Sequence, residues 1–380
     1  MRRIIKIGMD VHSTNYTLCA IESRFEEEDR TLAEARMDPE YGNILKFIER
    51  LKKKYHLESE DCDILCGYEA GCLGFSLYDQ LTASGIKCVI LAPSTMSVQK
   101  GVRIKTDKRD AHMIAECLVN NTYHAVHIPS KEDLDVREYI RMRDDHKLAL
   151  KEKKQQINAF CLHSGFYYDK TKWTDAHINW LRHLDFGRPI LRGVLDEYLS
   201  TYEQLKDKIE AFDARIAEFC NQEQYREKVS KLQCFCGIKT HAALSLLVET
   251  GDFQRFPKAC NYASFLGLIP GESSSSTDIN RLSITKAGNV HLRRLLVEAA
   301  QCICRGRVGH KSKDLKSRQA GNPPEVIAYA DKASERLRRR YYRGINRGKK
   351  RNVIVTAVAR ELACFIWGMM TDHIYQEGAA

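Results

Sequence analysis

Several patterns that define common enzyme classes are missing from this chain of 380 residues. Its fourteen cysteines include no CxxC pair, and most of them lie within apolar runs such as residues 232–236. Because zinc sites and redox sites depend on closely spaced pairs, we interpret the cysteines as reduced, buried, small hydrophobic residues of a cytoplasmic protein. No Walker motif is present, so nothing in the sequence points to ATP hydrolysis.

Long apolar runs free of charge are also missing. Lys6 and Asp10 interrupt the apolar residues of the first strand-like run, which is therefore not typical of a secretory signal. The apolar helix expected over residues 353–370 contains both an arginine and a glutamate, which argues against a membrane span. We therefore expect a protein without a membrane partner.

Basic residues outnumber acidic ones by ten, which favours a polyanionic partner. Residues 336–351 hold nine basic side chains and two adjacent tyrosines. Cations and aromatic faces together suit the phosphates and unpaired bases of single-stranded or structured nucleic acid. Arg338, Arg339 and Arg340 are the central candidates, although a solvated basic helix end explains this segment equally well.

The first 125 residues alternate between strand-like and helix-like patterns. Amphipathic helices are expected near residues 40–55 and 73–84, and the strand-like runs occupy residues 3–11, 15–22, 31–37, 63–69 and 87–91. Three antiparallel strands that precede parallel ones predict an α/β domain of the ribonuclease-H-like kind.

Four acidic residues of this region lie where their side chains can converge. The first strand alternates with period two, so Asp10 projects from the side opposite its apolar residues. Glu69 ends the fourth strand. Asp107 and Asp110 are three residues apart in the first turn of a helix expected to begin after Thr106, so they share one face of that helix.

Carboxylates in this arrangement suit a magnesium site. Mg²⁺ prefers oxygen ligands and keeps several waters, so four carboxylates without histidine or cysteine ligands fit a one- or two-metal site for phosphoryl transfer. Each acid taken alone is more often a solvated side chain. The prediction therefore depends on all four acids together.

From about residue 130 the apolar pattern becomes helical. A strict three-four spacing over more than three heptads predicts a coiled-coil seam, made of Leu195, Tyr198, Tyr202, Leu205, Ile209, Phe212, Ile216 and Phe219. The helix expected over residues 133–162 is a weaker partner, because basic residues such as Arg143 interrupt its apolar seam. We expect a two-helix coiled coil that links domains or joins protomers, with a purely internal bundle as the alternative.

A run of four serines, Ser273 to Ser276, follows a second apolar helical segment. Serine runs are usually flexible loops. This run precedes a basic cluster that contains Lys286, Arg293 and Arg294, so a hydroxyl nucleophile here could meet a phosphate.

These motifs resemble, over nearly the whole chain, the DEDD-type transposases of the insertion sequence 110 family, which are bridge-RNA-guided serine recombinases. The N-terminal motifs that carry the resemblance are Met9-Asp10-Val11-His12, Tyr68-Glu69-Ala70-Gly71, Ala92-Pro93-Ser94 and Lys105-Thr106-Asp107-x-x-Asp110-Ala111. The C-terminal motifs are Leu266-Gly267-Leu268-x-Pro270, the serine run and Lys286-x-Gly288-Asn289-x-x-Leu292-Arg293.

The resemblance implies a division of the chain into three regions. They are a RuvC-like DEDD catalytic domain over residues 1–128, a helical coiled-coil region over 129–228, and a helical transposase domain over 229–380 that carries the catalytic serine and the basic segment. The implied partners are donor and target DNA, a structured bridge RNA, and further copies of the chain in a dimer or tetramer.

The resemblance also implies roles for individual residues. Asp10, Glu69, Asp107 and Asp110 match the metal-binding tetrad, with Mg²⁺ as the cofactor. The position of the Leu-x-Pro proline favours Ser275 as the nucleophile, with Ser274 as the alternative because Ser276 stands where a glycine is expected. The nucleic-acid contacts are expected to be Lys105, Lys108, Arg109, Lys286, Arg293, Arg294, Arg338, Arg339 and Arg340.

Two other functions fit parts of the sequence. A RuvC-like nuclease that uses metal-bound water would explain the four acids but not the helical domain. A non-catalytic RNA-binding protein built on a nuclease fold would explain the basic charge but not the four intact acids.

Overall fold

The computed structural model describes residues 3–24, 28–57, 62–71, 73–96, 106–273 and 280–375. The chain divides after Ile128 into two compact units, and each is considered by itself. The two helical regions expected over residues 129–228 and 229–380 lie together in the second unit.

The first unit is built on a five-stranded mixed sheet of order β3-β2-β1-β4-β5. Strands β1, β2 and β3 are antiparallel neighbours, whereas β4 pairs parallel with β1 and β5 pairs parallel with β4. The strands are β1 (Arg3–Val11), β2 (Tyr16–Ser23), β3 (Arg30–Met37), β4 (Cys62–Glu69) and β5 (Lys87–Leu91). Every strand begins and ends within one residue of the run predicted from the sequence.

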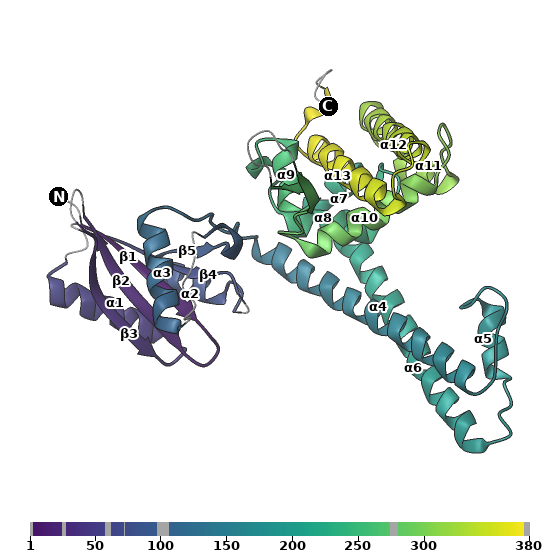
Figure 1. Cartoon of the computed structure of the whole chain (residues 1–380), viewed down its shortest axis with the longest axis horizontal. Helices are drawn as coiled ribbons and strands as arrows, with labels where there is room; N and C mark the ends of the chain where they lie inside the picture. Colours follow the sequence, from purple (N-terminus) through teal and green to yellow (C-terminus); the bar gives the residue numbers. More distant parts are fainter. Residues whose placement is uncertain are drawn as a thin grey trace. The chain divides into compact units, whose positions relative to one another are not determined.

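Helices cover both faces of this sheet (Figure 1). On one face α1 (Tyr41–Tyr55) and α2 (Ser76–Ala83) bury the apolar side of β1, which includes Ile7. On the opposite face lies α3 (Asp107–Val119), which follows the short 3₁₀ helix η1 (Pro93–Thr95).

The packing of α3 on the sheet depends on a glycine. A Cβ atom on Gly8 would lie 2.2 Å from the carbonyl oxygen of Ala111 and 2.2 Å from the nitrogen of Ala115, so no side chain fits between β1 and α3. The helix backbone therefore contacts the strand directly. This contact fixes the start of α3 beside the carboxyl end of β1.

The second unit contains a long helical hairpin of α4 (Lys131–His163) and α6 (Pro189–Cys220), with α5 (Asp175–Arg182) at its far end (Figure 1). The predicted seam is real but uneven. Leu195, Tyr202, Ile209 and Ile216 are buried, whereas Tyr198, Leu205, Phe212 and Phe219 are half-buried. The seam packs α6 against α4 of the same chain.

The basic interruption in α4 is part of this packing. Arg143 is buried, and its Nε and Nη2 donate to the two carboxylate oxygens of Asp213 on α6 at 2.8 and 2.9 Å. A bidentate pair satisfies a guanidinium that would otherwise be costly to bury. Arg143 therefore joins the two helices rather than weakening their contact.

Seven further helices of the described residues form a bundle, which meets the hairpin through α7 and α8. They are α7 (Glu223–Gln233), α8 (Thr240–Thr250), α9 (Ala259–Phe265), α10 (Val290–Arg305), α11 (Lys313–Gln319), α12 (Pro324–Asn346) and α13 (Arg351–Met370). The short elements between or after them are η2 (Phe253–Arg255), η3 (His373–Tyr375) and a two-stranded sheet of β6 (Pro270–Glu272) and β7 (Arg281–Ile284).

Helix α13 is the central helix of this bundle. By length and composition alone it could cross a membrane, yet eleven of its residues are buried inside the unit. It contacts α9, α10 and α12. Its apolar character is thus accounted for by the core.

The cysteines behave as small apolar residues. Nine of the thirteen that the described ranges contain are buried, among them Cys19 and Cys88, and none of the thirteen forms a disulfide. Burial raises the pKa of the Cys19 thiol to about 12 and that of Cys88 to about 12, so both stay protonated and unreactive near neutral pH.

Candidate functional site: an acidic cluster at a sheet edge

Asp10 and Glu69 lie at the same edge of the sheet. Met9 of β1 is level with Tyr68 of β4 in the parallel pairing, so the next residue of each strand stands in the same row. Side chains in one row of neighbouring parallel strands point to the same face. That face is the one covered by α3, because Gly8, two residues before Asp10, meets the backbone of that helix.

The first turn of α3 brings two more acids to this edge. Thr106 caps the helix by accepting a hydrogen bond from the backbone nitrogen of Arg109 at 3.4 Å, which defines where the helix begins. Asp107 and Asp110 then occupy the first turn, where the positive end of the helix dipole favours carboxylates.

Three potential ligands of this cluster lie close together. Nε2 of His12 is 3.3 Å from Oδ1 of Asp10, and one ligand atom from each of Asp10, His12 and Asp107 lies within 4.8 Å of the others. Asp107 also accepts a hydrogen bond from Nδ2 of Asn15 at 3.2 Å and lies 3.8 Å from Nη2 of Arg36. Residues from β1, the β1–β2 turn, β3 and α3 thus converge on one point.

The electrostatics of Asp10 indicate a place for a cation. Burial raises the pKa of Asp10, His12 lowers it, and the negative charges of Asp110 and Asp107 raise it further. Its Oδ2 atom is buried and has no hydrogen-bond partner among the described residues. A buried carboxylate oxygen without a partner is costly, and a divalent cation with its waters would satisfy it.

Glu69 differs from the other three acids. Its side chain is exposed, and it forms no hydrogen bond or ion pair within the described part of the chain. It is therefore available as an outer ligand at the open side of the cluster. All four predicted acids are thus found at one sheet edge, and His12 joins them.

Basic residues near the cluster are partly engaged. Nζ of Lys108 lies 2.6 Å from Oε2 of Glu34 on β3, and Arg109 is exposed. Lys105, also a predicted nucleic-acid contact, lies outside the described residues.

The serine run belongs to the β6–β7 hairpin of the second unit. The backbone nitrogen of Ser273 donates to the carbonyl of Asn280 at 2.9 Å, which closes the hairpin at the base of its loop. Ser274 and Ser275, the predicted nucleophiles, lie outside the described residues.

Two glycine motifs support the base of this hairpin. Gly267 and Gly288 have positive φ angles of 64° and 89°, and a Cβ on Gly288 would lie 1.9 Å from the carbonyl oxygen of Phe265. Asn289 then caps α10 through Leu292 at 2.9 Å. The motifs on either side of the serine loop therefore pack backbone against backbone.

The basic residues of the second motif have different roles. Nη1 of Arg293 donates to the carbonyl of Leu266 at 2.9 Å, which ties α10 to the turn before β6. Nη2 of Arg294 donates to Oδ2 of Asp144 at 2.6 Å. Lys286 is exposed with a positive φ of 55° and is the freest of the three to meet a phosphate.

The central arginines of the basic segment are mostly occupied within the protein. Arg338 is buried, and its Nη1 donates to the carbonyls of Arg307 and His310 at 3.0 and 2.8 Å. This burial removes Arg338 from the candidate nucleic-acid contacts. Arg340 pairs with Glu361 at 2.8 Å, and Arg339 is exposed but pairs with Glu335 within α12.

Comparison with known proteins finds two family models that match this chain. Residues 7–166 match the DEDD transposase model of the IS110 group, and residues 229–315 match the model described as the transposase IS116/IS110/IS902 family. The transposase for insertion sequence element IS1533 of Leptospira borgpetersenii is 33% identical over 359 residues, which cover 90% of this chain and 96% of that relative. The chain belongs to the IS110 family of transposases.

More distant relatives extend this IS110-family similarity. The transposase for IS1111A of Coxiella burnetii is 24% identical over 100% of this chain and 93% of its own length. A pilin gene-inverting protein of Moraxella bovis is 24% identical over 60% of this chain and 63% of its own length. A transposase acts on DNA and moves a mobile element by cutting and rejoining strands.

Some residues of the acidic site in this IS110-family chain were not expected from the sequence. His12 stands in the Met9-to-His12 motif, and its position beside Asp10 is the only signal that could have singled it out. Asn15 and Arg36 reach Asp107 across about 90 and 70 residues of sequence, because the antiparallel strands fold back on β1. Such long-range partners leave no local pattern.

Proposed function

We propose that this IS110-family transposase recombines DNA with a magnesium site formed by Asp10, Glu69, Asp107 and Asp110 on a RuvC-like, ribonuclease-H-like sheet. The observation that supports it most strongly is the buried, unpaired Oδ2 of Asp10, in a carboxylate whose neighbours include the acids of α3. The strand order and the position of the acids at the carboxyl ends of β1 and β4 agree with this fold.

The residues divide the work at this site. When bound, Mg²⁺ would supply positive charge against a scissile phosphate. Asp10 and Asp107 would hold the ion, Glu69 and Asp110 would complete its oxygen ligands, and His12 and Asn15 would orient the first two carboxylates through the contacts they already make.

We further propose that Ser275, or Ser274 in a register shifted by one, is the nucleophile. Its Oγ forms a bond to the phosphorus of the scissile phosphodiester, the bond from phosphorus to the 3′ oxygen breaks, and the serine proton passes to that oxygen, directly or through a base. The released 3′-hydroxyl can then attack another phosphoserine ester and rejoin strands without ATP. The gene inversion in the name of the Moraxella relative also requires strands to be rejoined.

The same proposal includes a guide and an assembly. A structured bridge RNA would choose the donor and target DNA, and two or four chains would combine their acidic and serine sites. The excess of ten basic residues supports a polyanionic partner of this kind.

Covalent trapping tests the nucleophile. Wild-type protein with bridge RNA, DNA and Mg²⁺ is digested, and the peptides that span Ser273 to Ser276 are mapped for an attached nucleotide. Ser275→Ala should bind nucleic acid normally but form no adduct and no recombinant, whereas Ser274→Ala should keep both. Replacement of a single serine hydroxyl by alanine rarely unfolds a protein.

The other outcomes of this experiment are equally informative. A nucleotide on Ser274 would move the register by one residue. Strand cleavage without an adduct on any of the four serines would overturn the covalent mechanism and favour a RuvC-like nuclease that uses metal-bound water.

A further inference from the structure

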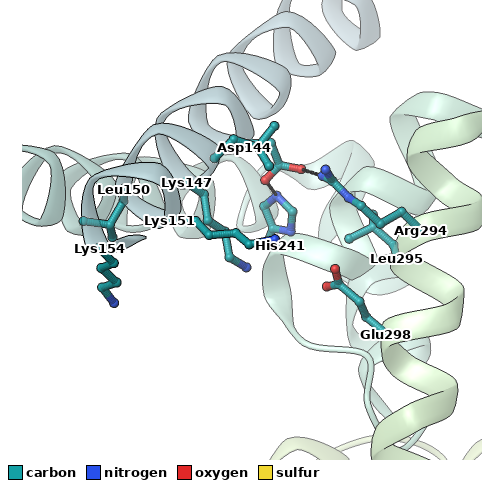
Figure 2. Close-up of a pocket in the computed structure, with 10 residues that line it drawn as sticks. Asp144, Lys147, Leu150, Lys151, Lys154, His241, Arg294, Leu295 and Glu298 are labelled. Atoms are coloured by element: carbon teal, nitrogen blue, oxygen red, sulfur yellow. Dashed lines mark hydrogen bonds and ion pairs between the residues drawn. The ribbon is translucent and has the colours of Figure 1, made fainter. Parts of the chain in front are cut away.

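A basic cavity lies in the second unit. It has a volume of about 410 Å³ and opens between α4, the start of α8 and α10. Besides Asp144, its charged and polar lining is formed by Lys147, Lys151, Lys154, His241, Arg294 and Glu298 (Figure 2). Cavities of this size hold a small ligand or a few groups of a larger one.

A buried carboxylate organises one wall of this cavity. Asp144 on α4 is 5% exposed, and its oxygens lie 3.1 Å from Nη1 of Arg143, 3.0 Å from Nε2 of His241 and 2.6 Å from Nη2 of Arg294. Figure 2 shows Asp144 between His241 and Arg294, which come from different helices. The contact with Asp144 fixes the direction of the Arg294 guanidinium. Its Nη1 and Nε form no hydrogen bond with the described residues.

The same helix carries lysines on the turns that follow Asp144. Lys147 and Lys151 are exposed and four residues apart, so they stand one above the other on the helix. Neither forms an ion pair with any described residue. Lys154 continues the row, and its Nζ lies 5.2 Å from the centre of the Trp173 ring.

The charge of the cavity therefore remains positive. The carboxylate of Asp144 is balanced by Arg294, and Arg143 is balanced by Asp213. Glu298 is the one further acid of the lining and opposes three lysines. The positive charge of these lysines therefore exceeds the negative charge of the lining. Elsewhere on α4, by contrast, basic residues such as Arg141 pair with acids.

We propose that this cavity binds the phosphodiester backbone of a nucleic acid, with Lys147, Lys151 and Arg294 as the phosphate contacts. A planar guanidinium held by a carboxylate presents its remaining N–H groups in a fixed direction, which suits phosphate oxygens. Two flexible lysines add point charges along the strand. The proposal rests on nucleic acid as the substrate class of this family, but not on the acidic site or on the serine.

The salt dependence of binding tests the proposal. Full-length Lys147→Gln/Lys151→Gln is titrated with a DNA duplex and, separately, with a structured RNA over a series of salt concentrations. The slope of log affinity against log salt should fall by about 1.8 for B-form DNA if each lysine contacts one phosphate, or by about 1.4 for a single-stranded region. The nucleic acid whose slope falls identifies the source of the phosphates.

A matched control separates this site from general charge. Lys208→Gln/Lys228→Gln removes two exposed helical lysines that lie outside the cavity. Its slope should equal that of the wild type. Unchanged slopes for the cavity variant with both nucleic acids, or an equal fall in the control, would overturn the proposal.

A third variant should act in the opposite direction. Glu298→Gln removes the acid that faces the lysines, so it should tighten binding of the same nucleic acid by about two- to fivefold, the usual size of an exposed charge contact. Weaker binding by Glu298→Gln would contradict a phosphate site here. Asp10→Asn serves as the reference for the active site, because loss of cleavage with an unchanged slope separates a failure of the metal proposal from a failure of this one.

Discussion

Two largely buried carboxylates, Asp10 and Asp144, have very different surroundings in this protein. Asp10 is largely buried with one oxygen unpaired, and burial raises its pKa. Burial would also raise the pKa of Asp144, but the hydrogen bonds and charges of His241 and Arg143 outweigh it and hold the pKa well below its usual range. Basic side chains of the fold thus balance Asp144, whereas Oδ2 of Asp10 has no hydrogen-bond partner among the described residues.

The first prediction concerns Asp10. In the metal-free protein, the contribution of Asp10 to the free energy of unfolding is complete when the pH lies below its ordinary pKa of 3.8. This contribution is lost as the pH rises through the raised pKa of the folded state. Asp10→Asn removes that loss, so at neutral pH it should unfold at the wild-type temperature or above. Mg²⁺ at a hundred times its dissociation constant should stabilise the wild type by about 2.7 kcal/mol and leave the variant unchanged.

Calorimetry with and without Mg²⁺ measures this difference. Strand cleavage by Asp10→Asn should also fall about a hundredfold or more, because the ion lowers the reaction barrier by several kcal/mol. Glu49→Gln, at an exposed position of α1, is the control and should respond to Mg²⁺ as the wild type does. An equal response of Asp10→Asn to Mg²⁺ would exclude Asp10 as a ligand.

The second prediction concerns Asp144. Asp144→Asn removes the buried carboxylate that Arg143, His241 and Arg294 share, and it should lower the free energy of unfolding by about 3 kcal/mol at neutral pH. Asp145→Asn, at the next and exposed position, should have little effect. Urea unfolding followed by circular dichroism gives both values. A loss no larger than that of the control would show that the network contributes nothing to stability.

Acid should weaken the same network in two stages. Burial lowers the pKa of His291, and the negative charges of Glu249 and Asp144 offset part of this shift. The contribution of His291 to stability is therefore complete above its ordinary pKa of 6.5 and is lost as the pH falls through the lowered pKa of the folded state. The contribution of Asp144 to stability is complete above its ordinary pKa of 3.8 and is lost as the pH falls through the lowered pKa of the folded state. Wild-type stability should therefore fall in both windows. Asp144→Asn should show a smaller second fall, because Glu22 and Glu249, whose pKa values are also lowered, still contribute there.

At the scale of elements, the serine hairpin stands on a contact between two glycine turns. A side chain at Gly288 would collide with the backbone of Phe265, and one at Gly267 with that of Ala287. The turns therefore hold the start of α10 against the end of α9. This contact positions the base of the hairpin without any side chain of its own.

The third prediction compares two glycines with similar backbones. Gly288→Ala should destabilise the second unit by about 2–4 kcal/mol, from the left-handed conformation together with the clash. Gly321 has a φ of 85° but open space around it, so Gly321→Ala should cost only about 1 kcal/mol. Equal losses in urea titrations of the two variants would contradict the clash.

The sequence predicted elements better than it predicted their partners. The strands and the four acids could be placed because period-two alternation and the spacing of Asp107 and Asp110 are local patterns. The burial of Arg338 could not be predicted, since its partners Arg307 and His310 come close only when α12 packs in the bundle. The network of Asp144 joins α4 to residues about 100 and 150 positions away and has no local signature.

At the scale of the whole molecule, each of the two units has an apolar core of its own. One large cluster in the first unit includes Ile7 and the residues of α1, and the largest cluster of the second unit includes Leu296 and the residues of α13. Two cores indicate two cooperative folding units.

The fourth prediction follows from the separate cores. Ile7 and Leu296 are both fully buried, so replacement of either by alanine should cost about 2–5 kcal/mol. In a calorimetric scan Ile7→Ala should lower one transition and Leu296→Ala the other. A single transition that both variants shift equally would show that the two units unfold together.

The glycine contact between β1 and α3 has a consequence for the inheritance of this element. Any substitution at Gly8 would push α3 away from the strand and separate Asp107 from Asp10, because even a methyl group would meet Ala111 at 2.2 Å. A genomic copy with such a substitution keeps every acid of the tetrad and would be judged intact by inspection of those acids. If the proposed magnesium site carries out the reaction, such a copy would be unable to move, and position 8 would then report whether a lineage is still active as directly as the acids do.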